Sequence, residues 1–302
     1  MVWLIRLVCS CLILHIVFSE EDSKLLLVQA LFRHGDRAPL HLYPTDPNTK
    51  DSWPEGLGKL TLLGKKQQYA LGKFLRSMYQ DFITTNPSEV LVNSSAADRC
   101  ITSAAATMAS FYAPEGRWKF EDDLNWQPIP IHYLPPHQDK FLRFRAKCPR
   151  ATEEMAKQRN SEEIQELFRK YQVQLEVVSN YSGLNIYQGI SIGYLYDAIQ
   201  IEHDIIIAAV LLSLNFTNMP LPPYCATLLF ELHEMTDASM TVRLLYLNST
   251  DPLADMGEPH VLEVEGCSEF CPVENFTDKL RHLIPEDWEQ ECQLDATSAV
   301  ET

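Results

Sequence analysis

The sequence has few basic residues for its size. It has 25 Lys and Arg against 41 Asp and Glu, a formal net charge of -16. A nucleic-acid partner requires a basic face, so this balance argues against DNA or RNA binding. The chain also lacks internal repeats and, after residue 18, any apolar run long enough to cross a bilayer. Its 46% hydrophobic content is enough for one large core, alone or with a smaller lobe.

The first 19 residues differ from the rest of the chain. Arg6 precedes an apolar run from Leu7 to Phe18, and the small Ser19 is followed by an acidic cluster. This pattern predicts a cleaved signal peptide over residues 1–19, and the run is short for a membrane anchor. We therefore expect the mature chain to be secreted or to reach the lysosomal lumen, without a membrane anchor.

Sequons and cysteines both fit passage through the secretory route. Five Asn-x-Ser/Thr sequons are candidate glycosylation sites, at Asn93, Asn180, Asn215, Asn248 and Asn275. Six cysteines follow the signal peptide, at Cys100, Cys148, Cys225, Cys267, Cys271 and Cys292. An even set in an oxidising compartment favours disulfides. Zinc is the weaker interpretation, because Cys267 and Cys271 have no second Cys or His pair at matching spacing nearby.

Two apolar runs each lead toward an arginine. Lys24 to Phe32 is nearly continuous, which is typical of a buried parallel strand, and it ends at Arg33. Glu89 to Asn93 is a second short run, followed by Arg99. A helix is predicted after each run, the first capped by Thr61 and the second Ala-rich. This order predicts an α/β fold with its chemistry at the carboxyl ends of the strands.

The second half of the chain predicts helices and then strands. Apolar residues at helical spacing from Glu153 to Val178 predict a smaller helical lobe over about residues 130–200. Ala226 to Leu232 and Met240 to Leu247 predict adjacent strands joined by a turn. Residues 293–302 are expected to form a flexible tail, so the folded domain is assigned to residues 20–292.

The segment from Arg33 to Pro39, RHGDRAP, carries the strongest chemical signal. Arg33 and Arg37 flank one imidazole, and arginine suits phosphate because its planar fork of donors keeps its charge. Gly35 allows a tight turn and a close approach to a ligand. His34 is then a candidate nucleophile toward phosphorus. The structural alternative is that both arginines pair with nearby acids on a solvated loop.

RHGDRAP resembles the signature of the histidine acid phosphatases, the lysosomal and prostatic type, within the histidine phosphatase superfamily. The resemblance continues in order through YAPEG (112–116), KCPR (147–150), YSGL (181–184), LPPY (221–224), GCSEFCP (266–272) and IPEDWEQEC (284–292). It implies a phosphoglycerate-mutase-like α/β fold, in which helices flank a mainly parallel sheet beside a smaller helical lobe. The implied activity is hydrolysis of phosphate monoesters through a phosphohistidine.

The resemblance also assigns roles to residues of this chain. It implies that His34 becomes phosphorylated, that Arg33, Arg37, Arg99 and His203 bind the phosphate, and that Asp204 protonates the leaving alcohol. No metal or cofactor is expected, because these cationic groups already neutralise the phosphoryl charge. The family pattern further implies disulfides Cys148–Cys292 and Cys267–Cys271. It leaves Cys100 and Cys225 without an assigned partner.

The chain departs from the family just before His203. The family carries a long segment there, with helices and a strand, whereas residues 197–202 of this chain run directly into the His-Asp pair. Loss of a strand should leave backbone groups unpaired and apolar surface uncovered. Tyr194 to Ile201 has a suitable length for a substitute strand.

Three functions stay open at this point. The first is an acid phosphatase that acts on small phosphate monoesters or phosphoproteins, as a monomer or a homodimer. The second is a catalytically impaired, phosphatase-like secreted binding protein, because the segment before His203 is missing. The third is a phytase or phosphomutase of the same superfamily. The extended match to the acid phosphatases argues against this third function.

Overall fold

The computed structural model describes residues 23–142, 147–186, 195, 197, 205–248 and 257–294. The predicted signal peptide, residues 1–19, and the tail after residue 294 lie outside this part. In chain order the elements are β1 (Ser23–Phe32), η1 (Lys50–Ser52), α1 (Leu62–Met78), η2 (Pro87–Glu89), β2 (Val92–Ser94), α2 (Asp98–Phe111), η3 (Gly116–Trp118), β3 (Ile131–Tyr133), α3 (Pro149–Arg159), α4 (Glu162–Lys170), α5 (Gln172–Ser182), α7 (Ile205–Ser213), β4 (Thr227–Met235), β5 (Met240–Leu247), β6 (His260–Val261), β7 (Cys271–Pro272), α8 (Val273–Leu280), η4 (Arg281–Leu283) and α9 (Trp288–Glu291).

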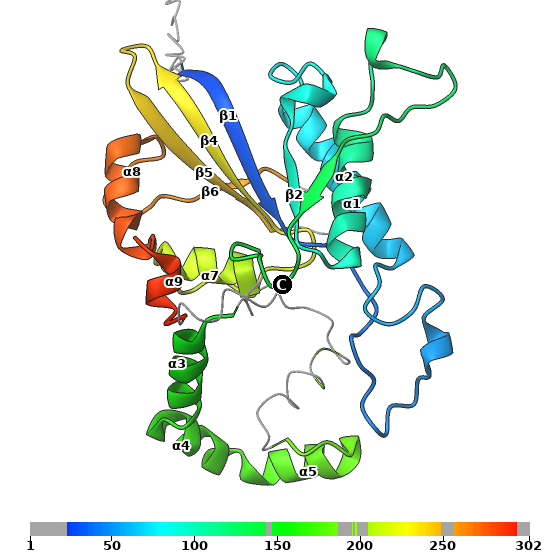
Figure 1. Cartoon of the computed structure of the whole chain (residues 1–302), viewed down its shortest axis with the longest axis vertical. Coiled ribbons are helices and arrows are strands. Elements are labelled where there is room, and N and C mark those ends of the chain that lie inside the picture. The colour runs from blue at the N-terminus through cyan, green and yellow to red at the C-terminus, as the bar shows by residue number, and fades with distance from the viewer. Residues whose placement is uncertain are drawn as a thin grey trace, which may run out of the picture.

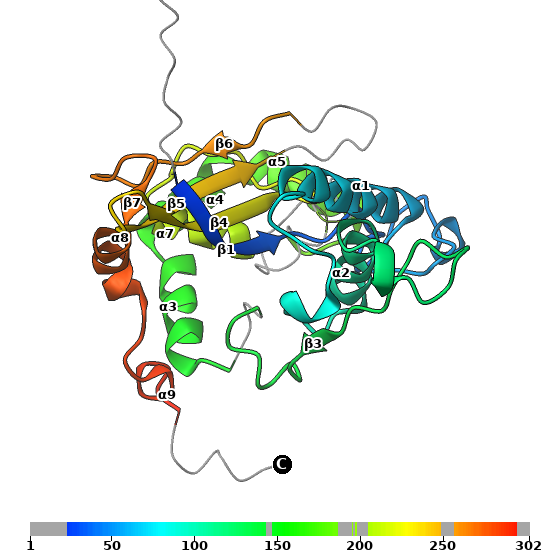
Figure 2. The same cartoon turned by 90° about the horizontal axis from the view of Figure 1, so that it is seen from above.

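A five-stranded sheet forms the centre of the molecule (Figure 1). Its order is β1-β4-β5-β6, with β7 also paired to β5, and every pairing described in it is antiparallel. β2 and β3 form a separate two-stranded parallel sheet. Seen from above, this pair lies beside α2, across the molecule from β7 (Figure 2).

The fold is α/β, but the expectation of a mainly parallel sheet is wrong. β4 and β5 are joined by a short turn, so they form a hairpin, and a hairpin is necessarily antiparallel. The apolar run in β1 predicts burial on both faces, yet none of its residues is fully buried and Leu27 is 57% exposed. Strand direction depends on the neighbour, here β4 from far along the chain, and a local apolar pattern does not contain that information.

Helices cover both faces of the sheet because side chains alternate along each strand. On one face, Leu229 and Leu245 pack with Leu71 and Leu75 of α1. On the other face, the adjacent strand residues pack with α7, and α8 adds partly buried side chains. Part of the helical prediction is also met, since α3, α4 and α5 form an arc below the sheet (Figure 1). No described helix is long and apolar enough to cross a bilayer.

Two disulfides fix the C-terminal part. Cys148, just before α3, is bonded to Cys292, just after α9. Cys267 and Cys271 close a short loop before α8. These are the two pairs that the family resemblance implies. Cys100 and Cys225 are free thiols, and Cys225 is buried.

Helices α1 and α2 approach each other closely at Gly72. A Cβ atom there would lie 2.1 Å from Ser110 Oγ and 2.2 Å from the Thr107 carbonyl oxygen. Backbone atoms cannot move away as a flexible side chain can, so a larger residue would push the helices apart. Both helices carry residues that hold the loop after β1, as described below.

We expect Gly72→Ala to destabilise the protein by about 1–3 kcal/mol, because this overpacking outweighs the higher helix propensity of alanine. Urea denaturation of the purified protein measures the loss. Lys73→Ala, at the next and exposed position of the same helix, serves as the matched control and should change stability by less than about 0.5 kcal/mol. Equal stabilities for the two variants would contradict the close helix contact.

Candidate active site

The loop after β1 begins with Arg33 and is held on three sides. The Arg33 amide donates to the Ala226 carbonyl at 2.9 Å, which extends the β1–β4 pairing by one step. Gln68 of α1 donates through Nε2 to the Arg33 carbonyl at 2.8 Å. Ser103 of α2 accepts a hydrogen bond from the Gly35 amide at 3.2 Å. The loop therefore has a fixed backbone before any ligand binds.

Gly35 packs directly against the first turn of α1. A Cβ atom at Gly35 would lie 2.4 Å from the carbonyl oxygen of Gly64, and one at Gly64 would lie 2.1 Å from that of Asp36. The sequence suggests that Gly35 approaches a ligand, whereas the structure shows a close approach to this helix. The Asp36 amide donates to Gln67 Oε1 at 2.8 Å and completes the contact.

His34 has a defined tautomer. Its Nδ1 lies 2.8 Å from the Gly35 carbonyl oxygen. Since a carbonyl can only accept, Nδ1 carries the hydrogen and Nε2 keeps its lone pair. Burial lowers the pKa of His34 well below its ordinary value. The positive charges of Arg33, Arg99 and Arg37 lower this pKa further, while the Gly35 hydrogen bond opposes them. The imidazole therefore stays neutral in mildly acidic solution.

Arg33 is almost completely buried, with 1% of its surface exposed. Its NH1 donates to the Pro222 carbonyl at 2.8 Å, and its guanidinium lies 4.2 Å from the ring centroid of Tyr224. The Tyr224 ring also lies beside His34, with 5.7 Å between ring centroids. Burial raises the pKa of Tyr224, so its hydroxyl stays protonated. The segment 222–224 thus fixes both Arg33 and His34.

Arg37 is held by a carboxylate that the sequence did not single out. Both terminal nitrogens of Arg37 bond to Asp197, with NH1 at 3.3 Å from Oδ2 and NH2 on Oδ1, and both side chains are buried. Asp197 also accepts from the Leu40 amide at 2.8 Å. The Nε of Arg37 is buried and has no hydrogen-bond partner among the described residues. An unsatisfied buried donor beside an ion pair suits an anionic ligand.

Arg99 lies in the first turn of α2 and completes the cationic group. Its Nε is also buried and has no partner in the described part of the chain. Arg99 is close enough to His34 to lower its pKa. The structure therefore brings together four of the predicted site residues: Arg33, His34, Arg37 and Arg99. His203 and Asp204 lie outside the described residues, and α7 begins at the next residue, Ile205.

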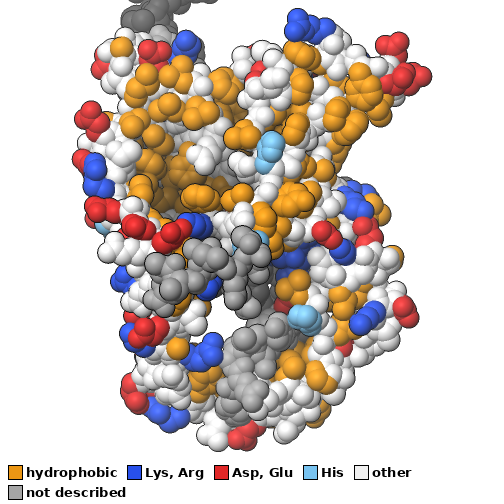
Figure 3. Space-filling model, in the orientation of Figure 1, with side chains coloured by type: hydrophobic (Ala, Val, Ile, Leu, Met, Phe, Trp, Pro, Cys, Tyr) orange, Lys and Arg blue, Asp and Glu red, His pale blue; other side chains and the backbone are white. Residues whose placement is uncertain are grey.

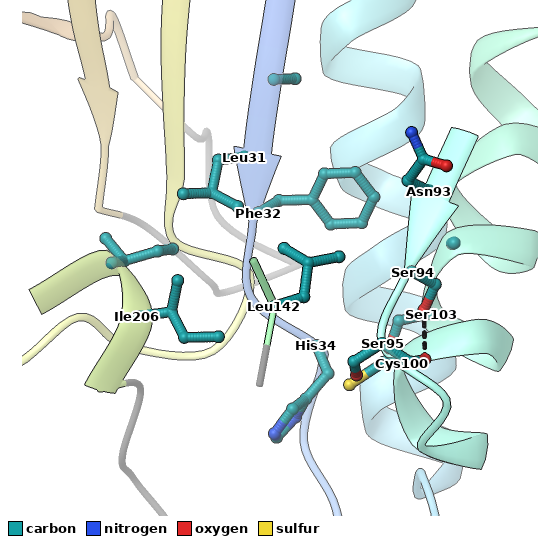
Figure 4. A pocket seen from close by; sticks show the side chains of 13 residues that line it. Leu31, Phe32, His34, Asn93, Ser94, Ser95, Cys100, Ser103, Leu142 and Ile206 are labelled. Atoms are coloured by element: carbon teal, nitrogen blue, oxygen red, sulfur yellow. Dashed lines mark hydrogen bonds between the residues drawn. The ribbon is translucent and has the colours of Figure 1, made fainter. Parts of the chain in front are cut away.

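A cavity of about 110 Å³ opens beside His34, between β1 and β2 (Figure 4). Its wall is apolar on the side of β1 and α7 and carries hydroxyl and thiol groups on the side of β2 and α2. The residues that line it include Leu31, Phe32, Ser94, Cys100 and Ile206. No group of three or more His, Cys, Asp or Glu side chains in the described ranges is arranged to hold a metal ion.

Sequence reasoning missed the residues that hold the site. Asp197, Tyr224, Gln68 and Ser103 make the contacts above, but none of them stands in the RHGDRAP segment. The sequence contained a partial indication for Gln68, because this polar residue interrupts the apolar face of α1. In the structure Gln68 is fully buried. A buried amide needs hydrogen-bond partners, so such a position indicates a structural contact.

The fold and the site together define a class of protein: an α/β protein with a half-buried histidine of lowered pKa after a strand, in the field of three arginines. A family model described as "Histidine phosphatase superfamily (branch 2)" matches residues 24–189. The chain belongs to this family.

Curated relatives agree with this assignment. The chain is 28% identical over 349 residues to lysosomal acid phosphatase of Xenopus laevis, covering 90% of this chain and 80% of the relative. It is 28% identical over 351 residues to prostatic acid phosphatase of Homo sapiens, covering 91% and 89%. Both alignments are longer than the 302 residues of this chain, so each relative carries segments that this chain lacks.

Solved structures show the same fold. The chain is similar to a phytase from Citrobacter braakii, with a TM-score of 0.60 and 16% identity, covering 89% of this chain and 99% of that one. Apo phytase of Hafnia alvei gives a TM-score of 0.61 at 17% identity, covering 90% and 98%. At this level of identity the likeness concerns the fold alone.

We expect Asp197→Asn to destabilise the protein by about 3 kcal/mol, because it leaves the Arg37 guanidinium buried without its counter-charge. Urea denaturation measures the loss. Asp278→Asn removes one partner of an exposed ion pair with Arg281 and should cost less than about 1 kcal/mol. If both variants lost the same small amount, the buried pair would not stabilise the fold.

Proposed function

We propose that this chain is an acid phosphatase that hydrolyses phosphate monoesters through a phosphohistidine on His34. One observation carries the proposal: His34 is neutral, presents the lone pair of Nε2, and lies within the field of three arginines. A neutral imidazole is the nucleophilic form. The curated relatives, which are lysosomal and prostatic acid phosphatases, support the same activity.

The first half of the reaction forms a bond from His34 Nε2 to phosphorus and breaks the bond from phosphorus to the ester oxygen. Arg33, Arg37 and Arg99 bind the phosphoryl oxygens and neutralise their charge in a site with little water, where such interactions are strong. The leaving oxygen needs a proton, and an acid placed near it contributes about 10²–10⁴-fold in rate. We assign that role to Asp204, with His203 on the phosphate.

The described neighbours of this pair support the assignment. Asp197, seven residues before Asp204, bonds to Arg37. Ile206, two residues after Asp204, lines the cavity that also contains His34. The described residues on both sides of the His203–Asp204 pair therefore lie at the site. In the second half of the reaction, water attacks phosphorus, the bond to Nε2 breaks and phosphate leaves, with Asp204 accepting the proton of the water.

Several finer assignments belong to the same proposal. We place the mature chain in the lysosomal lumen or outside the cell. Small phosphate monoesters are the proposed substrates, phosphoproteins remain candidates, and a homodimer remains open. A catalytically impaired binding protein is the competing function, and the following experiment separates the two.

We expect His34→Ala to lower turnover of p-nitrophenyl phosphate near pH 5 by at least about 10³-fold, because it removes the nucleophile. The mature chain should be expressed in a secretory host. Alkaline quench, which preserves the acid-labile phosphorus–nitrogen bond, after mixing with substrate labelled in the phosphate should trap label on the wild-type protein and none on the variant. Equal rates for both proteins would reject the enzyme, and label on the variant would reject His34 as the nucleophile.

The rate of phosphoenzyme formation should not fall as the pH decreases from about 6.5 to about 5. A histidine with an ordinary pKa near 6.5 would become mostly protonated, and the population of its nucleophilic form would fall about 16-fold over this range. The lowered pKa of His34 keeps the imidazole neutral there. Single-turnover kinetics with p-nitrophenyl phosphate measure this rate, and a loss of about 16-fold would contradict the neutral site.

A further inference from the structure

Two strand edges face the cavity beside His34 without a described partner. Among the described residues, β1 pairs only with β4, and β2 pairs only with β3. Ala30, Leu31 and Phe32 of β1 line one side of the cavity, and Asn93 and Ser94 of β2 line the other (Figure 4). The two strands thus line a shared hollow, and their edges on that side have no strand partner in the part of the chain that the structure describes.

The β1 side of this hollow is strongly apolar. From Leu25 to Phe32 the strand has no charged residue, and Leu27 is 57% exposed. α7 has no charged residue either, and Leu212 is also 57% exposed. Figure 3 shows hydrophobic side chains gathered around a hollow in the upper part of this face. An exposed, uncharged edge strand pairs readily with strands of other chains and promotes aggregation unless something covers it.

Asn93 is positioned so that a group attached to its side chain would lie over this edge of β1. It is the central residue of β2, where Val92 and Ser94 are buried and the Asn93 side chain is exposed. Its amide makes no hydrogen bond to another described residue, unlike that of Asn215, which donates to Glu265 at 3.2 Å. Asn93-Ser94-Ser95 is a glycosylation sequon. Of the five sequon asparagines, Asn93 alone is among the residues described as lining the cavity.

We propose that Asn93 carries an N-linked glycan that lies over the rim of the hollow between β1 and β2, away from His34, and covers the edge of β1 that has no partner among the described residues. In the transfer, Asn93 Nδ2 bonds to C1 of an oligosaccharide on a lipid pyrophosphate donor. The bond from C1 to the pyrophosphate oxygen breaks, and an amide proton is lost. Sugar hydroxyls can hydrogen-bond to free backbone groups, and the hydrated bulk of the glycan keeps other strands away.

The test uses the full chain, secreted from a glycosylating host. Asn93→Gln and Ser95→Ala both remove the sequon, whereas Ser95→Thr keeps it. Asn180→Gln removes a sequon on α5 that does not line the cavity, and it is the matched control. Mass spectrometry of glycopeptides reports occupancy, amide hydrogen exchange reports protection of residues 23–32, and sedimentation velocity reports self-association.

We expect Asn93 to be occupied in the wild type and in Ser95→Thr. In the two variants without the sequon, residues 23–32 should exchange roughly tenfold faster or more, and the protein should shift to larger species. Asn180→Gln should behave as the wild type. If the variants are not secreted, trimming the glycans of the folded wild type to single sugars with an endoglycosidase provides the same comparison.

An unmodified Asn93 in the secreted wild type would overturn the proposal. Unchanged exchange of residues 23–32 and unchanged sedimentation after loss of the glycan would also overturn it. None of these measurements uses phosphatase activity. Their failure is therefore distinguishable from failure of the proposed function.

Discussion

Buried positive charge is the constraint on which the rest of the site depends. Arg33, Arg37 and Arg99 surround one imidazole, and a guanidinium leaves water only if other groups replace its hydration. Arg33 obtains the Pro222 carbonyl and the face of Tyr224, and Arg37 obtains Asp197. These partners come from distant parts of the sequence. The fold must therefore bring them to the end of β1 before phosphate can bind.

The same constraint favours the neutral form of His34 on which the proposed function depends. Burial and three positive charges lower the pKa of the imidazole, and the Gly35 carbonyl selects the tautomer that leaves Nε2 without a hydrogen. The position of the His34 loop matters as much as the charge around the imidazole. Gln68 and Ser103 fix the loop backbone from α1 and α2, and Gly72 allows these helices to pack closely. The close packing of the two helices thus also fixes the position of His34.

The sequence predicted which residues gather after β1 better than it predicted the architecture around them. RHGDRAP and Arg99 identify the cationic group because arginine and histidine have few other reasons to cluster at a strand end. β4, β5 and α1 follow from local patterns that the structure bears out. The direction of β1 and the partners Asp197 and Tyr224 depend on contacts across the whole chain. No periodicity within one segment encodes such contacts, so they became visible only in the structure.

The segments that the curated relatives carry and this chain lacks bear on these observations. The curated relatives are longer than this chain in their alignments, and the described β1 has a partner on only one side. An apolar strand that suits a central position is therefore exposed at an edge, next to the nucleophile. The catalytic groups and this edge depend on different contacts, because Arg33 and His34 are held by β4, α1 and segment 222–224. The structure can thus keep Arg33 and His34 in place although the β1 edge has no partner among the described residues, and the backbone and exposed leucines of that edge require another cover.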